Sequence, residues 1–241
     1  EILMHFYRPL SPIKAMTFDL DDTLYDNHPV IDKTEEEVLR FIREYDPRFD
    51  HFTNDDIYAF RYLVEEQEPD IRHDITRWRW LSSKMMLCHY GYSKEDALKG
   101  ADDIMAHFTY WRNQIHVPQS THETLAKLAE KLPLVAITNG NAEPQACGLG
   151  QYFQFVLKAG PDGRSKPCCD MYHLASTRLN IEPSAILHVG DNLLTDVEGA
   201  INSGMQACWF NVDHMTLMDE KEGRILPHVE ICRLDSLLTL V

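Results

Sequence analysis

The sequence predicts an α/β fold, in which a parallel sheet carries helices on both faces and an all-helical segment is inserted after the first strand. Two patterns predict this. Residues 117–241 alternate short apolar runs with amphipathic stretches, as in a parallel sheet covered by helices. Residues 29–116 contain no run typical of a strand and are periodic at helical spacing. We therefore expect a core formed by residues 1–27 and 117–241, and a helical cap formed by residues 28–116.

The first expected strand covers residues 13–18, which are largely apolar and follow a proline. An acidic turn, Asp19-Leu20-Asp21-Asp22-Thr23, comes directly after it. Ligands of open α/β sheets bind at the carboxyl ends of the strands, where this turn would lie. Like charges at Asp19 and Asp21 are costly without a cation or a role in proton transfer. The turn therefore indicates a reaction centre.

The inserted segment is expected to hold successive helices. One helix is predicted from Ile71 to Tyr90, between the start and stop signals Pro69 and Gly91. Its inward positions would be Ile71, Ile75, Trp78, Met85 and Cys88. Another helix should follow Ser93, a capping residue, because apolar residues then recur at steps of three and four. An all-helical insertion of this kind is a candidate lid.

Later strands are expected at residues 134–137, 155–157, 185–189 and 205–210. The first three lead to polar groups, and these are Thr138-Asn139-Gly140, Ser165-Lys166-Pro167 and Gly190-Asp191. Because parallel strands end at one edge of a sheet, we expect these groups to meet the acidic turn there. Taken alone, each group also fits a turn, a surface lysine or a helix cap.

The combined groups suit chemistry on a phosphate ester. Asp19 is the candidate nucleophile, because a carboxylate can displace an alkoxide from phosphorus. Asp21 could protonate the leaving oxygen and then deprotonate water. Thr138 and Lys166 could hold phosphoryl oxygens, with Pro167 in a first helical turn that favours anions. The other polar residues of these turns, Asp22, Asn139 and Gly140, are expected to contact the substrate.

Magnesium is the expected cofactor, since an all-oxygen site with several carboxylates suits a hard cation. The candidate ligands are Asp19, Asp21, Asp191 and Asp196. For Asp196 three roles stay open: it could bind the metal directly, bind it through water, or orient Lys166.

Composition excludes several classes of protein. The chain has 241 residues and a net charge of −15, which argues against nucleic-acid binding. No apolar run reaches the ~18 residues of a membrane span, and no amino-terminal stretch resembles a secretion signal. Six cysteines without metal-site spacing are expected to be reduced thiols. We expect a cytoplasmic monomer or homodimer that binds a small-molecule phosphate ester, with no nucleic acid or membrane partner.

The order of these motifs resembles the haloacid dehalogenase superfamily, at the acidic turn, Thr138, Lys166, and Gly190-Asp191 through Asp196. The resemblance covers the whole chain and implies a Rossmann-like core, an inserted helical cap and a magnesium cofactor. It also implies that the backbone carbonyl of Asp21 is a metal ligand. Members that cleave carbon–halogen or carbon–phosphorus bonds usually lack the second acid. Because Asp21 is present, phosphate-ester hydrolysis is favoured.

Longer strings resemble one bacterial subfamily, whose phosphatases act on 5-amino-6-(5-phospho-D-ribitylamino)uracil in riboflavin synthesis and on flavin mononucleotide. The strings are Phe6–Leu10, His73–Arg79, Ala136–Asn141 and Gly163–Pro167. The alternatives within the superfamily are a phosphosugar phosphatase and a phosphomutase. An alternative of another class is a non-catalytic sensor that binds a phosphorylated ligand.

On the helix predicted from Ile71, a polar stripe would lie beside the apolar face. His73, Arg77, Trp80 and Lys84 follow one another at steps of four, three and four. Such a stripe could stack a flavin or pyrimidine ring and attract an anion, and the substrate-binding candidates in it are His73, Arg77 and Trp80. A plain solvated helix face is the alternative.

Overall fold

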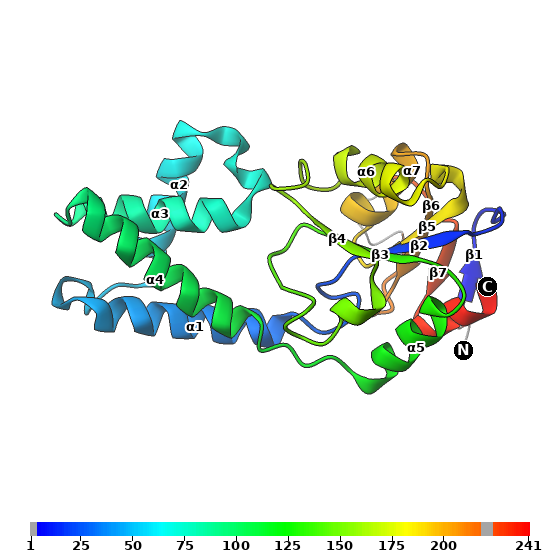
Figure 1. Cartoon of the computed structure of the whole chain (residues 1–241), viewed down its shortest axis with the longest axis horizontal. Helices are drawn as coiled ribbons and strands as arrows, with labels where there is room; N and C mark the ends of the chain where they lie inside the picture. The colour runs from blue at the N-terminus through cyan, green and yellow to red at the C-terminus, as the bar shows by residue number, and fades with distance from the viewer. Residues whose placement is uncertain (1–3, 218–223) are drawn as a thin grey trace. The chain divides into compact units, whose positions relative to one another are not determined.

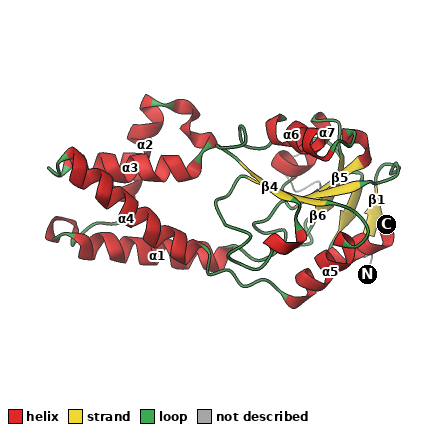
Figure 2. Ribbon diagram, viewed as in Figure 1, coloured by secondary structure: helices red, strands yellow, loops and turns green. Residues whose placement is uncertain are grey.

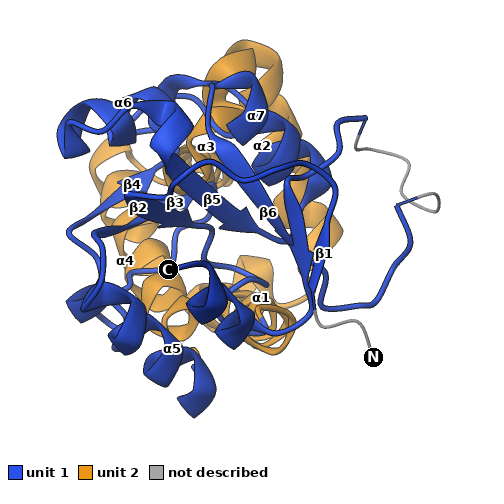
Figure 3. Ribbon diagram, turned by 90° about the vertical axis from the view of Figure 1, so that its right-hand side faces the viewer, with its two compact units in different colours: residues 1–26, 116–241 blue, residues 27–115 orange. Residues whose placement is uncertain are grey.

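The computed structural model describes residues 4–217 and 224–241. The chain divides into two compact units, one formed by Glu1–Asp26 with His116–Val241 and one formed by Asn27–Ile115 (Figure 3). All the described strands belong to the first unit, and the second is helical (Figure 2). Within the described ranges, no helix is long and apolar enough to cross a bilayer.

The first unit contains a seven-stranded sheet in the order β1-β7-β6-β5-β2-β3-β4. The strands are β1 (Met4–Phe6), β2 (Ala15–Phe18), β3 (Leu134–Thr138), β4 (Phe155–Lys158), β5 (Ile186–Gly190), β6 (Gln206–Phe210) and β7 (Val229–Ile231). Every neighbouring pair is parallel except β1 with β7. The central strands β2, β3 and β5 are buried throughout, which explains their continuous apolar sequences. The predicted α/β fold with an inserted helical segment is confirmed.

Helices cover both faces of this sheet (Figure 1). On one face lie α6 (Asp170–Leu179), the π-helix η5 (Leu193–Glu198) and α7 (Gly199–Asn202). The other face carries α5 (Gln119–Ala129) and the 3-10 helix η6 (Leu234–Leu240). Short 3-10 helices, η3 (Gly150–Tyr152) and η4 (Pro183–Ala185), precede β4 and β5. The α6 face packs on the sheet through an apolar core that includes Met171, Val197 and Ala200.

The second unit is built from α1 (His28–Tyr45), α2 (Asn54–Gln67), α3 (Ile75–His89) and α4 (Lys94–Arg112). Short 3-10 helices, η1 (Pro47–Phe49) and η2 (Pro69–His73), precede α2 and α3. Thr53, Asp74 and Ser93 cap three of the helices, each accepting a hydrogen bond from a backbone N–H three residues later. Aliphatic and aromatic side chains from α1, α2, α3 and α4 form its own core.

The single helix predicted from Ile71 to Tyr90 is wrong. Asp74 has φ −135° and ψ 86°, so it interrupts the helical backbone and separates η2 from α3. Its side chain accepts from the backbone N–H of Arg77, which favours a new helix start there over continuation. His73 therefore lies on η2, and the predicted four-residue stripe does not lie on one helix.

The inward face predicted for this region is also partly wrong. Cys88 is exposed, whereas the buried positions of α3 are Ser82, Ser83, Met86 and Leu87. The hydroxyls of Ser82 and Ser83 donate to carbonyl oxygens one turn earlier, which satisfies them inside the unit. Polar residues can therefore lie on the buried face, and apolar periodicity alone misplaces it.

Candidate active site

Three neighbouring parallel strands bring the predicted site residues together. β2 pairs with β3 and with β5, so Phe18 lies opposite both Ala136 and Val189. The backbone N–H of Asp19 continues the ladder by donating to the carbonyl of Val189 at 2.9 Å. Asp19 and the groups that follow β3 and β5 therefore leave the sheet at the same edge.

Asp19 is buried and held on both carboxylate oxygens. Its Oδ1 accepts from the Lys166 Nζ at 2.9 Å, and its Oδ2 accepts from the Thr23 hydroxyl at 3.1 Å. Burial and the charge of Asp196 raise the pKa of Asp19 well above its ordinary value, although Lys166 opposes the shift. The charge of Asp191 adds to the rise.

Lys166 is the cation of the site, and only 1% of its side chain is exposed. Its Nζ donates to Asp19 Oδ1, Asp196 Oδ1 and the carbonyl of Ile137, at 2.9, 2.8 and 2.8 Å. An ammonium group has three hydrogens, so these bonds use its full capacity. Burial alone would lower the pKa of Lys166, but the carboxylates of Asp19 and Asp196 raise it above its ordinary value. Lys166 is therefore a fixed positive charge beside Asp19.

The loop that carries Lys166 is attached to the end of β3. The side-chain amide of Asn139 donates to the Lys166 carbonyl at 2.9 Å and accepts from the Lys166 backbone N–H at 2.8 Å. Thr138 is buried, and its Oγ1 accepts from the backbone N–H of Gly140 at 2.9 Å. The Thr138-Asn139-Gly140 turn thus positions both a hydroxyl and the lysine loop.

Pro167 is not in a first helical turn, which corrects the sequence prediction. The helix α6 begins only at Asp170, and residues 167–169 form turns before it. The Lys166–Pro167 peptide bond is cis. The sequence pattern had no signal for it. Lys166 is therefore placed by Asn139 and its own side-chain bonds.

An oxygen-only cluster lies beside this ammonium group. Single carboxylate oxygens of Asp19, Asp191 and Asp196 all lie within 4.8 Å of one another. Burial, and then the charge of Asp196, raises the pKa of Asp191 to about 6. Three carboxylates beside one lysine leave an excess of buried negative charge, which a divalent cation would offset. The donor set is all oxygen, so the cluster fits a hard cation such as Mg²⁺.

Asp196 is the most constrained carboxylate of the cluster, and it lies on η5. Its Oδ1 accepts from Lys166 Nζ at 2.8 Å and lies 2.9 Å from Nε2 of His188, while its Oδ2 accepts from the Asn192 N–H at 3.2 Å. Burial opposes its charge, yet Lys166 and His188 lower the pKa of Asp196 to about 2. These contacts favour the role in orienting Lys166.

The two other acids of the first turn lie nearer the surface than Asp19. Asp21 Oδ1 accepts from the Tyr25 hydroxyl at 2.5 Å. Asp22 has φ +63°, a left-handed conformation that non-glycine residues seldom adopt. This backbone turn lets the chain double back after β2, so that Thr23 can reach Asp19 and also lie 3.1 Å from Asp191.

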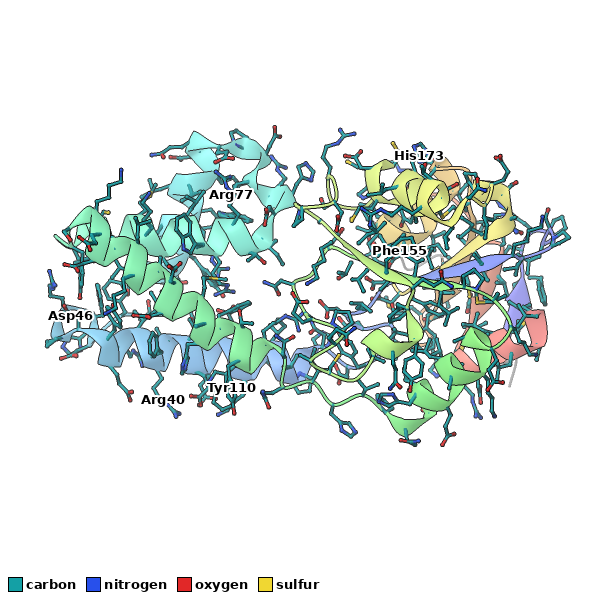
Figure 4. All side chains as sticks on the ribbon, in the orientation of Figure 1. Arg40, Asp46, Arg77, Tyr110, Phe155 and His173 are labelled. Carbon is teal, nitrogen blue, oxygen red and sulfur yellow. The ribbon has the colours of Figure 1, made fainter. Side chains whose placement is uncertain are left out.

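Two of the substrate-binding candidates of the helical unit, Arg77 and Trp80, form contacts inside that unit. Arg77 forms an ion pair with Glu68 at 2.5 Å, and it is labelled on the second unit in Figure 4. The indole N–H of Trp80 donates to Asp102 at 2.8 Å. Both side chains interact with acids of their own unit, and His73 lies on η2.

Sequence reasoning missed two residues of the site, Thr23 and His188. Thr23 could have been found, because it follows Asp19 by four residues in an acidic turn. His188 gave no signal, since a single histidine inside an apolar strand is typical of a core residue. Its contact with Asp196 depends on the fold of η5 back onto β5.

Comparisons with known proteins agree with this geometry. The 5-amino-6-(5-phospho-D-ribitylamino)uracil phosphatase YigB of Escherichia coli (strain K12) is 56% identical over 238 residues, 99% of this chain and 100% of the relative. The structure of a 2-haloacid dehalogenase from Pseudomonas syringae pv. Tomato DC3000 has a TM-score of 0.89 at 32% identity, covering 95% of this chain and 97% of that one.

A more distant structure shares the fold. The putative HAD-hydrolase YfnB of Bacillus subtilis, described as bound to magnesium, has a TM-score of 0.62 at 20% identity over 95% of this chain and 99% of that one. Residues 13–204 match the family described as haloacid dehalogenase-like hydrolase, a span that includes every core site residue above. With the acidic turn, the lysine and the carboxylate cluster assembled at one sheet edge, the chain belongs to the haloacid dehalogenase-like hydrolase family.

Proposed function

We propose that the chain is a magnesium-dependent phosphomonoesterase that works through an aspartyl-phosphate on Asp19. One observation carries the proposal: the Asp19 carboxylate lies buried at the end of β2 beside the fixed charge of Lys166, with Asp21 two residues later. A binding protein would need the positive charge, but it would not need a nucleophile and an acid together.

Each residue has a separate part in the proposed reaction. Asp19 attacks phosphorus, and Asp21 gives its proton to the departing alkoxide. Asp21 then takes a proton from water, which attacks the aspartyl-phosphate and releases phosphate from Asp19. The Thr138 hydroxyl, which accepts from Gly140, would donate its hydrogen to a phosphoryl oxygen. Lys166 offsets the charge of Asp19 as the anionic substrate approaches.

The proposed metal ligands are Asp19, Asp191 and the backbone carbonyl of Asp21, the last implied by the family resemblance. Bound Mg²⁺ would neutralise phosphoryl charge. Asp196 lies close enough to join them, but its bonds to Lys166 and His188 support a positioning part.

The similarity to a 2-haloacid dehalogenase makes carbon–halogen cleavage the second candidate. A halide is a weak base and leaves without a proton, whereas an alkoxide leaves poorly unless an acid protonates it. A dehalogenase therefore has no need of a proton donor at position 21. The presence of Asp21 favours the phosphate ester.

For the substrate we propose 5-amino-6-(5-phospho-D-ribitylamino)uracil, with flavin mononucleotide as a further substrate in riboflavin metabolism. The support is the relative of that activity, which is 56% identical along the full length of both chains. A cytoplasmic monomer or homodimer is part of the same proposal.

Asp19→Asn tests the nucleophile, because the change is nearly isosteric and removes only the attacking oxygen. Phosphate release should fall below about a hundredth of wild type with an unchanged circular dichroism spectrum. Retention of more than about a tenth of the activity would falsify Asp19 as the nucleophile. Asn141→Asp, outside the cluster, is a control for altered charge in the nearby loop.

The substrate is tested with a panel assayed in Mg²⁺ and in chelator. The panel contains the ribitylaminouracil phosphate, flavin mononucleotide, a sugar phosphate, a chromogenic phosphate ester and 2-chloropropionate. Magnesium-dependent phosphate release, fastest from the first ester, is expected. Chloride release without phosphate release would contradict the phosphatase. Transfer of phosphate to a sugar would indicate the phosphomutase.

A further inference from the structure

His188 lies inside the sheet directly behind the reaction centre. It is fully buried in the middle of β5 and opposite Thr17 of β2 in the strand register. Its Nδ1 lies 2.7 Å from the Thr17 hydroxyl, and its Nε2 lies 2.9 Å from Asp196 Oδ1. The Tyr172 ring meets the imidazole edge-on, with centroids 4.9 Å apart. Both ring nitrogens are therefore bonded and the ring orientation is fixed.

The chemistry of its two partners decides which ring nitrogen of His188 donates a hydrogen bond and which accepts one. A carboxylate accepts hydrogen bonds, so Nε2 carries a hydrogen and donates it to Asp196. In the neutral ring Nδ1 is then an acceptor, and the Thr17 hydroxyl donates to it. The chain of donors runs from Thr17 through His188 to the carboxylate that also accepts from Lys166.

His188 is linked to the charged group of Lys166 through Asp196 Oδ1. The same oxygen accepts from His188 and from Lys166 Nζ, at 2.9 and 2.8 Å. Nζ in turn donates to Asp19 at 2.9 Å. Without the imidazole, the carboxylate of Asp196 could rotate away, and Lys166 would lose one of its three acceptors. Small displacements of catalytic groups lower rates strongly.

We propose that His188 is a positioning residue, which holds Asp196 so that Lys166 stays directed at Asp19. The effect on turnover rests on the proposed phosphatase function, whereas the effect on Lys166 does not. A plain core histidine would affect folding only. In a His188 variant that still folds, Lys166 should therefore be displaced if His188 is a positioning residue and stay in place if it is a plain core histidine.

The turnover test compares His188→Leu and His188→Gln with Leu187→Ala, a buried neighbour on the same strand that serves as the matched stability control. His188→Leu should lower kcat about 10- to 100-fold, with KM changed less than about threefold. His188→Gln, whose amide can donate to Asp196, should recover most of the loss. Thr17→Val should lower kcat more mildly. Equal kcat in His188→Leu and Leu187→Ala would overturn the proposal.

A second measurement needs no substrate. The Lys166 ammonium group, buried and fully bonded, should give a protected ¹H–¹⁵N signal, assigned by its loss in Lys166→Met. The signal should shift or broaden in His188→Leu, return toward its wild-type position in His188→Gln, and remain in place in Leu187→Ala. An unmoved signal in His188→Leu would refute the positioning role. A wild type that releases no phosphate from any ester, with the signal moved as expected, would refute only the phosphatase.

Discussion

A methyl group at position 190 would collide with Asp196. A Cβ built on Gly190 would lie 2.2 Å from Asp196 Cγ and 2.4 Å from its Oδ2. The carboxylate cannot simply move aside, because Lys166, His188 and Asn192 all hold it. Glycine at the end of β5 is therefore required by the close approach of η5, in addition to any demand of the turn.

Gly190→Ala should displace Asp196 and disturb Lys166. We expect kcat to fall by about tenfold or more, with a loss of about 1–3 kcal/mol in the free energy of unfolding from overpacking. Gly100→Ala is the matched control, since its Cβ would lie 2.5 Å from Leu87 Cδ1 inside the helical unit. It should cost stability and leave kcat within about threefold. Urea unfolding and steady-state assays measure both. A fully active Gly190→Ala would contradict this account of Asp196.

Among the elements, the strands that build the site could be predicted from sequence. β2, β3 and β5 are continuous apolar runs, each followed by a polar group, and parallel pairing then places those groups at one edge. The edge pair β1 and β7 could not be predicted, because each has only three residues and their pairing joins opposite ends of the chain. The pairing register of two strands that lie far apart in the chain leaves no pattern in the local sequence of either strand.

Contacts that depend on irregularities of the helical backbone could not be predicted from the sequence either. The interruption at Asp74 moves the buried face of α3, and a capping aspartate inside an otherwise helical stretch gave only a weak signal. The π-helix η5 places Asp196 between Lys166 and His188, and π-helical turns have no sequence signature to match. Core site residues were thus predictable as a set, but their mutual contacts were not.

The outer residues of α3 give a test of leaving-group recognition. Lys84 Nζ lies 5.7 Å from the Trp80 ring centroid, so this part of the helix presents an aromatic surface beside a cation. Replacing Arg77 and Trp80 by alanine should raise KM for flavin mononucleotide about tenfold and leave KM for a small generic ester unchanged. Thr76→Ala, an exposed neighbour, is the control. Unchanged KM for both esters would leave these residues as a solvated helix face.

At the scale of the whole molecule, the negative charges of Asp19 and Asp191 oppose folding, and a bound cation would offset them. The chain has a net charge of −15, and the carboxylates of Asp19, Asp191 and Asp196 lie within 4.8 Å of one another, with Lys166 bonded to Asp19 and Asp196. Burial and Asp196 raise the pKa of Asp191 to about 6, above the value of about 4 for an unfolded aspartate. The site therefore costs stability in exchange for affinity toward a divalent cation.

Asp191→Asn should reveal that cost. Between about pH 4 and pH 6 the folded state binds more protons at Asp191 than the unfolded state does, so this group's contribution to the free energy of unfolding falls as pH rises. In chelator near pH 7, Asp191→Asn should melt at a higher temperature than wild type. The difference should shrink as pH falls through that window, because protonation neutralises Asp191 in the wild type.

Added Mg²⁺ should reverse the order of the two proteins near pH 7. The wild type gains stability by binding the ion in its folded state, whereas Asp191→Asn lacks a charged ligand and gains less. Calorimetric melting curves with and without Mg²⁺ measure both effects, and Ca²⁺ serves as a second hard cation. If Asp191→Asn melted below the wild type in chelator and gained as much from Mg²⁺, Asp191 would be neither an electrostatic cost nor a metal ligand.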